Sequence, residues 1–182
     1  MYNLNWLKAQ YDNNENLKYI FFWKNTPSKD GLITKTCMSQ WWGNYAFQVD
    51  GIHYETTEHW MMAGKARLFN DDEILQAILA DKSPSKAQKC GRKVRNYDGN
   101  IWRDNNSQIV AQGNFHKFSQ HEDLKTYLLN TGNSILVEAS PLDRIWGIGL
   151  AQDAPNIENP HTWQGDNLLG FALMEARDML RK

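Results

Sequence analysis

The sequence predicts a single compact α+β domain that is mostly helical and is built around a small β-sheet. Three observations support this prediction. The length of 182 residues is that of one domain. Short aromatic and β-branched runs, which are typical of strands, stand at residues 19–23 and 134–138. Longer stretches elsewhere repeat apolar residues at helical spacing, and this mixture of strands and helices is typical of an α+β fold.

The first part of the chain is expected to hold most of the strands. Residues 1–18 are polar and rich in Asn, so we expect an N-terminal extension with room for a short helix. The domain itself is predicted over residues 19–182 and begins with the strand at 19–23. Residues 47–54 predict a β-hairpin, because Asp50-Gly51 is a favoured two-residue turn.

From residue 56 onward the apolar residues follow a helical period. Thr56 or Thr57 can cap a first helix, which is expected to run to Phe69. The pattern of residues 101–110 is ambiguous, and their conformation stays open. The remaining elements are predicted as helices over 71–80, 83–91, 121–129 and 167–180, a strand over 134–138 and a loop over 141–149.

Composition excludes several classes of protein. The formal net charge of −1 lacks the basic bias of most free nucleic-acid binders. No apolar run reaches the ~20 residues that a membrane span requires, and the N-terminus does not resemble a signal peptide, so we expect a cytoplasmic protein. The eight Trp residues suit either a cleft that stacks a flat ligand or a Trp-rich core.

No cofactor or metal site is visible in the sequence. The two cysteines, Cys37 and Cys90, cannot form a disulfide framework or a zinc site by themselves. The His59 region is not the His-Glu-x-x-His pattern of zinc proteases, because no second His lies at that spacing. We therefore expect neither a metal nor a cofactor, and we interpret His59 as a structural hydrogen-bonding residue.

Glu58 and Lys65 are the first candidates for chemistry. They are seven residues apart, so a helix places them on one face, two turns apart, beside Met61 and Met62. Burial of such charges is costly unless they are paired or used. The alternative is that Glu58 only favours the helix dipole and Lys65 is solvated. Because the neighbouring residues are apolar, we favour a pair that projects into a cleft.

A second candidate region follows the strand at 134–138. Asp143, Trp146 and Gly147 lie in a loop after a rigid element, where function often concentrates. The glycines Gly147 and Gly149 suit a close approach of backbone and ligand, although the alternative is an ordinary surface turn.

Three further candidates are weaker when taken singly. Lys117 could hold a phosphate, although most lysines are solvated. Trp102 could stack on a base, and Asn167 stands in a glycine-flanked segment before the closing helix.

Taken together, these segments resemble the NADAR (YbiA-like) family from about residue 19 to the C-terminus. The matching motifs, in order, are Phe21-Phe22-Trp23, Ser39-Gln40-Trp41-Trp42, Thr56-Thr57-Glu58-His59-Trp60-Met61-Met62-Ala63-x-Lys65-Ala66, Gly91-Arg92, Ile101-Trp102, Lys117-Phe118-x-Gln120, Leu136-Val137-Glu138-Ala139-Ser140, Asp143-x-x-Trp146-Gly147-x-Gly149 and Asn167-x-Leu169-Gly170. The order and spacing of these motifs, rather than any single motif, carry the resemblance.

The resemblance implies a mainly helical α+β fold and N-glycosidase activity on ribosylated bases. Some members cleave phosphoribosylamino-pyrimidine intermediates of riboflavin synthesis and release ribose 5-phosphate, and others remove ADP-ribose from guanine. It implies functional roles for Glu58, Trp102 and Asp143, and it matches Lys65 to a lysine proposed to act at the sugar C1. The implied partner is a small ribosylated base, or a nucleic acid that carries the modification.

Two routes and two rival functions stay open at this level. Glu58 could stabilise positive charge at C1 or activate water, or Lys65 could form a Schiff base, a route that the Glu58 charge would partly oppose. ADP-ribosylated guanine in DNA would need a basic rim. The run of basic residues between 86 and 95 offers one, unless it is simply a solvated face. A non-catalytic module that only binds ADP-ribose would use the same pocket.

Overall fold

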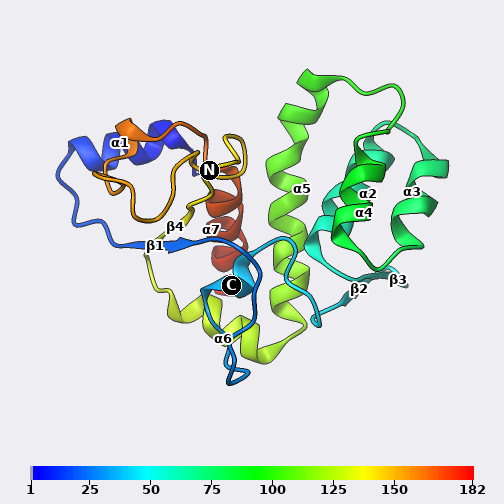
Figure 1. Cartoon of the computed structure of the whole chain (residues 1–182), viewed down its shortest axis with the longest axis horizontal. Helices are drawn as coiled ribbons and strands as arrows, with labels where there is room; N and C mark the ends of the chain where they lie inside the picture. Colours follow the sequence, from blue (N-terminus) through cyan, green and yellow to red (C-terminus); the bar gives the residue numbers. More distant parts are fainter. Residues whose placement is uncertain (1) are drawn as a thin grey trace. The chain divides into compact units, whose positions relative to one another are not determined.

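The computed structural model describes residues 2–182, which form seven α-helices and four short strands (Figure 1). The predicted α+β class, with helices in the majority, is confirmed. Contacts within the chain define two compact units. The terminal unit comprises the chain up to Ser39 together with Asp123–Lys182, and the central unit is Gln40–Glu122.

The terminal unit is built on a parallel pair of strands. Strand β1 (Tyr19–Phe22) pairs with β4 (Ile135–Glu138), so Tyr19 lies opposite Ile135 and Phe22 opposite Glu138. Helix α7 (Leu168–Leu180) packs against β4, and Gly170 makes this close approach possible, because a Cβ there would collide with the Leu136 carbonyl oxygen. The remaining elements of this unit are α1 (Leu4–Asp12), the 3-10 turns η1 (Lys35–Met38) and η2 (Pro160–Thr162), and α6 (Glu122–Asn130), whose first residue belongs to the central unit.

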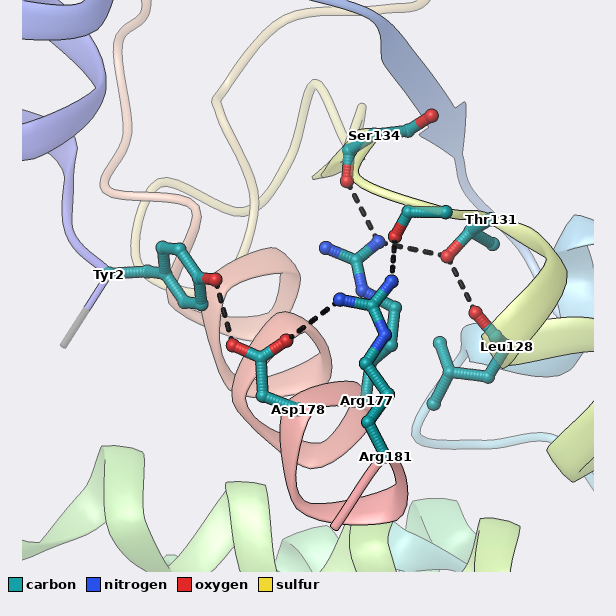
Figure 2. Close-up of polar contacts among 8 residues, drawn as sticks. Tyr2, Leu128, Thr131, Ser134, Arg177, Asp178 and Arg181 are labelled. Atoms are coloured by element: carbon teal, nitrogen blue, oxygen red, sulfur yellow. Dashed lines mark hydrogen bonds and ion pairs between the residues drawn. The ribbon is translucent and has the colours of Figure 1, made fainter.

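The C-terminal half of α7 is tied to the rest of the terminal unit by polar contacts (Figure 2). The buried Arg177 guanidinium donates to the Thr131 hydroxyl and to the Ser134 carbonyl, both at 2.9 Å. Asp178 accepts from the Tyr2 hydroxyl at 2.8 Å and from Arg181 at 3.2 Å. These contacts anchor the start of the chain and the turn between α6 and β4 onto one helix.

The central unit begins with the predicted hairpin. Strands β2 (Phe47–Val49) and β3 (Ile52–Tyr54) are antiparallel, and Asp50 and Gly51 between them have φ values of 51° and 76°. Positive φ at both turn residues is typical of the type I′ turn, which matches the twist of a hairpin. The Asp-Gly signal in the sequence is therefore confirmed.

Helix α2 (Thr57–Leu68) is the centre of this unit. It packs against α3 (Asp72–Leu79), α4 (Pro84–Gly91) and α5 (Gly99–Ser119), as Figure 1 shows. Buried residues occur all around α2, which is consistent with a helix covered on several sides.

The segment that the sequence left open lies inside α5, a helix of 21 residues. Asn-rich stretches and two glycines obscure its helical period. Packing against α2 explains one of these glycines, because a Cβ at Gly113 would collide with the Trp60 ring. The Trp60 indole also donates to the Ile109 carbonyl at 2.8 Å. Contacts between helices thus decide a conformation that local pattern could not.

Candidate functional site

The first turn of α2 is held by side chains that serve the fold. The helix begins after the extended residue Thr56, whose hydroxyl bonds His59 Nδ1 at 2.9 Å rather than capping the helix. His59 Nε2 donates to the Asp81 carbonyl at 2.9 Å, so Nδ1 accepts from Thr56. Burial lowers the pKa of His59, which favours this neutral form. Both ring nitrogens are engaged, and the interpretation of His59 as a structural residue is confirmed.

Glu58 is buried in this same turn, with 2% of its surface exposed. Its backbone N–H donates to the Gln40 carbonyl at 3.0 Å, and the neighbouring Thr57 hydroxyl donates to the same oxygen at 3.2 Å. An acid that only favours the helix dipole can stay in water, whereas burial of a carboxylate carries a large desolvation cost. The position of Glu58 therefore argues for a specific use of its side chain.

Buried polar groups extend from Gln40 to α5. The Asn114 amide donates to the Gln40 side-chain oxygen at 3.2 Å and to the Val110 carbonyl at 2.9 Å. Lys117 lies one turn further along α5 and is completely buried, with its Nζ 5.1 Å from the centroid of the Phe118 ring. Lys117 is thus not the solvated lysine that the sequence left as an alternative. Sequence reasoning did not connect Gln40, whose carbonyl accepts the Glu58 N–H, with Asn114, because Gln40 and Asn114 are 74 positions apart in the chain.

Lys65 lies in the last turn of α2 and is half-buried. Its Nζ is 4.2 Å from the centroid of the Tyr97 ring and 5.7 Å from that of the Trp102 ring. Burial lowers the pKa of Lys65, and the positive charge of Arg92 lowers it further. Sequence reasoning considered Glu58 as the charge acting on Lys65 and missed Arg92, which comes from the end of α4.

A pocket of about 490 Å³ lies against another face of α2. Trp60, Gly64 and Arg67 contribute to its lining from this helix, and Asn105 and Ile109 contribute from α5. Neither Glu58 nor Lys65 lines it. Because the candidate catalytic groups point elsewhere, we do not place the chemistry in this pocket.

The candidates of the terminal unit lie in the loop after β4. Asp143 Oδ1 accepts the backbone N–H groups of Ile145 and Trp146, both at 2.8 Å, and so fixes the turn. Within residues 2–182, Asp143 Oδ2 makes no hydrogen bond, and both Asp143 and Trp146 are half-buried. One carboxylate oxygen shapes the loop, and the other is available to a ligand.

The glycines of this loop have a packing role. A Cβ at Gly147 would lie 2.9 Å from the Glu138 carbonyl oxygen and 3.0 Å from that of Asp143. Gly149 has a φ of +69°, a conformation that favours glycine. Within this unit, Gly147 therefore allows the loop backbone to pack closely against the Glu138 and Asp143 carbonyl groups.

Asn167 supports the same region from the start of α7. It is fully buried, its Oδ1 accepts the Glu138 N–H at 3.0 Å, and its Nδ2 donates to the Leu136 carbonyl at 2.9 Å. Its own N–H donates to the Gly147 carbonyl at 3.2 Å. With its amide engaged on both sides, Asn167 is placed to hold β4 and the loop rather than to contact a substrate.

The predicted residues thus form two sets, each described within its own unit. Glu58, Lys65, Trp102 and Lys117 belong to the central unit, and Asp143, Trp146, Gly147 and Asn167 belong to the terminal unit. Among the described residues 2–182, no group of three His, Cys, Asp or Glu side chains is arranged to hold a metal ion. In the same part of the chain, no helix has the length and apolar character needed to cross a membrane.

Comparison with known families matches residues 21–181 to the NADAR domain. The chain belongs to the NADAR family. Membership explains why the motifs around Glu58, Trp102 and Asp143 occur in one order and at these spacings.

Relatives with curated names are similar over most of the chain. N-glycosidase R617 of Acanthamoeba polyphaga mimivirus is 42% identical over 166 residues, which is 88% of this chain and 95% of the relative. N-glycosidase YbiA of Escherichia coli K12 is 31% identical over 136 residues, or 75% of this chain and 76% of the relative. The NMR structure of E. coli YbiA superposes with a TM-score of 0.71 at 27% identity, covering 90% of this chain and 85% of YbiA. The α+β fold is therefore shared with YbiA.

Proposed function

We propose that this protein hydrolyses the bond between a base nitrogen and C1 of a ribose-type sugar. Its relatives R617 and YbiA are N-glycosidases, and the shared family makes this chain a hydrolase of N-glycosyl compounds. The observation that carries the finer proposal is the placement of Glu58 and Lys65 on α2. One is a buried carboxylate, and the other is a half-buried amine with a lowered pKa.

Lys65 acts as the nucleophile in this proposal. Ring opening of a ribosylamine converts C1 into an imine carbon bonded to the base nitrogen. The lone pair of a neutral Lys65 Nζ adds to C1, the base nitrogen gains a proton, and the base leaves as a free amine. Water then adds to the C1–Nζ imine and releases the sugar aldehyde and the lysine. The lowered pKa of Lys65 supports this route, because only the neutral amine can attack.

Glu58 moves protons and stabilises charge in this scheme. A buried carboxylate is suited to both tasks, because an electrostatic interaction is stronger where water is excluded. It would deliver the proton to the leaving nitrogen and take one from the attacking water. If C1 reacts without ring opening, the same carboxylate stabilises the oxocarbenium-like transition state.

The remaining roles rest on the family resemblance and on local geometry. We assign Asp143 to the ribose hydroxyls, through the oxygen that the turn does not use. Trp102 and Trp146 would contact the base, and the buried Lys117 would serve as a fixed positive charge for substrate anions. Gly147 and Asn167 are assigned to shaping the loop.

The proposed substrate class is a phosphoribosylamino-pyrimidine of the kind found in riboflavin synthesis. ADP-ribosylated guanine in DNA is a less suitable substrate, because the expected basic rim is partly neutralised. Lys86 pairs with Asp81 at 2.8 Å, and Arg95 pairs with Asp71 and with Glu73. A module that only binds ADP-ribose would not need an amine with a lowered pKa.

The test is release of free base from a phosphoribosylamino-pyrimidine, with ADP-ribosylated guanosine compared at equal concentration. We expect faster release from the pyrimidine. Borohydride added during turnover should attach the sugar mass to the peptide that contains Lys65, and a sample without substrate is the control. Base release without an adduct on Lys65 would assign the attack to water. Absence of base release from both compounds, with tight binding of ADP-ribose, would replace the enzyme by a binding module.

A further inference from the structure

Tyr97, a residue with no assigned role, provides the nearer of the two aromatic rings that contact the Lys65 amine. The Lys65 Nζ lies 4.2 Å from the Tyr97 ring centroid, compared with 5.7 Å from that of Trp102. Both distances are within the ~6 Å at which a cation is attracted to an aromatic ring. The end of the Lys65 side chain is therefore flanked by two rings, one from the segment that precedes α5 and one from α5 itself.

The Tyr97 ring is fixed from the side of α2. It packs edge-on against Phe69, the C-cap residue that follows α2, with the ring centroids 5.4 Å apart and the planes at 62°. Since Phe69 and Lys65 are four residues apart, Tyr97 contacts two successive turns of one face of the helix. Its hydroxyl makes no hydrogen bond with the described residues, so only the ring is used.

The backbone on both sides of Tyr97 is also anchored. Two residues earlier, the Arg95 N–H and Nε donate to Asp71 Oδ2 at 2.8 and 3.1 Å, and its Nη2 donates to Asp71 Oδ1. This pairing holds the pKa of Asp71 well below its usual range. One residue later, Asp98 caps α5 by accepting the N–H groups of Asn100 and Ile101. Such a short, tethered segment gives Tyr97 little freedom.

Tyr97 combines this fixed position with an exposure of 49%, which is high for a large aromatic side chain. The hydroxyl of an exposed tyrosine that makes no hydrogen bond to the protein adds little to the stability of the fold. Its ring nevertheless covers one side of a half-buried amine. We propose that Tyr97 is a positioning residue for Lys65, whose amine it holds beside Trp102 and shields from water. This inference rests on the proposed nucleophilic role of Lys65.

The test compares Tyr97→Ala and Tyr97→Phe with the intact chain. Tyr97→Ala exposes one side of the Lys65 amine to water and removes the ring that holds the amine in position. We therefore expect kcat to fall roughly tenfold to a hundredfold. Tyr97→Phe keeps the ring and should restore kcat. Tyr11→Ala is the matched control, because Tyr11 is an exposed tyrosine of α1 whose ring contacts His161. It should leave kcat unchanged.

A second readout does not depend on any substrate. Reductive methylation by formaldehyde and cyanoborohydride, followed by mass spectrometry, measures the reactivity of the Lys65 amine at pH 7.5. Loss of the Tyr97 ring removes a cation–π attraction that favours the protonated amine, but it also admits water, which favours the same form. Burial is the main cause that lowers the pKa of Lys65, so we expect the entry of water to prevail, Tyr97→Ala to slow this reaction and Tyr97→Phe to leave it unchanged. Unchanged or faster methylation in Tyr97→Ala, or equal damage by both substitutions, would overturn the positioning role. If Tyr97→Ala slows methylation of Lys65 but the protein releases no base from any substrate, the positioning role stands and only the proposed function is refuted.

Discussion

Helices α7 and α2 both carry basic side chains away from bulk water, but they use them differently. In α7, Arg177 is 1% exposed and donates to the Thr131 hydroxyl and the Ser134 carbonyl (Figure 2). In α2, Lys65 faces two aromatic rings and makes no hydrogen bond or ion pair with the described residues. A buried side chain that is bonded to the chain, as Arg177 is through Nη1, serves the fold, whereas an amine left without such partners is available for chemistry.

The same contrast applies to the polar residues near β4 and in the first turn of α2. Asn167 and His59 have both ends of their side chains bonded to the protein. Asp143 is intermediate, since one oxygen fixes a turn and the other makes no hydrogen bond within residues 2–182. Whether all polar atoms of a side chain are hydrogen-bonded to the protein therefore distinguishes supporting residues from candidate catalysts better than residue type does.

A loss as large as any expected in this protein should come from Lys65→Met, which keeps the apolar stem and removes the amine. Because the reacting group itself is lost, base release should fall by about 10²–10⁴-fold. The control is Arg67→Met on another face of α2, where the guanidinium donates to the Tyr54 hydroxyl at 2.5 Å. Turnover assays should show that Arg67→Met remains active. Equal losses in the two variants would indicate damage to the helix rather than to the chemistry.

A stability effect without a chemical one is expected from Arg177→Met. The substitution removes the donor to the half-buried Ser134 carbonyl and to the buried Thr131 hydroxyl, which keeps its own bond to the Leu128 carbonyl at 2.6 Å. Because one acceptor loses its partner, at a cost of about 1–3 kcal/mol, unfolding should become easier by roughly 1–3 kcal/mol. Urea denaturation measures this change, and Arg181→Met, which removes more exposed contacts, should cost less. If the folded Arg177→Met protein lost activity without losing stability, α7 would have more than a structural role.

The smallest effect is expected from Arg92→Gln. Arg92 is exposed and lowers the pKa of Lys65 by charge repulsion. Without it the pKa of Lys65 rises toward its usual value, so the rising limb of the rate against pH should move to higher pH. High salt should move the limb of the unsubstituted protein in the same direction, because it screens the same charge. A limb that moves to lower pH would contradict the assignment to Lys65.

The sequence predicted much of the fold because its local signals are strong. The Asp50-Gly51 turn, the helix from Thr57 and the strand over 135–138 follow from turn chemistry, the helical spacing of apolar residues and β-branched runs. The side-chain cap expected from Thr56 or Thr57 is absent, because the Thr56 hydroxyl bonds His59 instead. The conformation of residues 101–110 could not be predicted from local pattern, because it depends on packing against α2, where the Trp60 indole bonds the Ile109 carbonyl 49 positions away.

The candidate site was predicted only in part. The spacing of Glu58 and Lys65 placed them on one face of a helix, and the family motifs added Trp102 and Asp143. Arg92 and Tyr97 were missed as neighbours of Lys65, because α4 and the following segment reach α2 only through tertiary packing. A tyrosine in a polar segment carries no signal of its own in a single sequence.

The most direct test of the account is the rate of base release by Glu58→Gln, which keeps the shape of the side chain and removes its charge. Glu122→Gln is the matched control, since Glu122 is an exposed acid at the first residue of α6. We predict a loss of about 10²–10⁴-fold for Glu58→Gln, with a folded protein by circular dichroism, and full activity for Glu122→Gln. Near-normal turnover by a folded Glu58→Gln variant would contradict the central claim that α2 carries the active carboxylate.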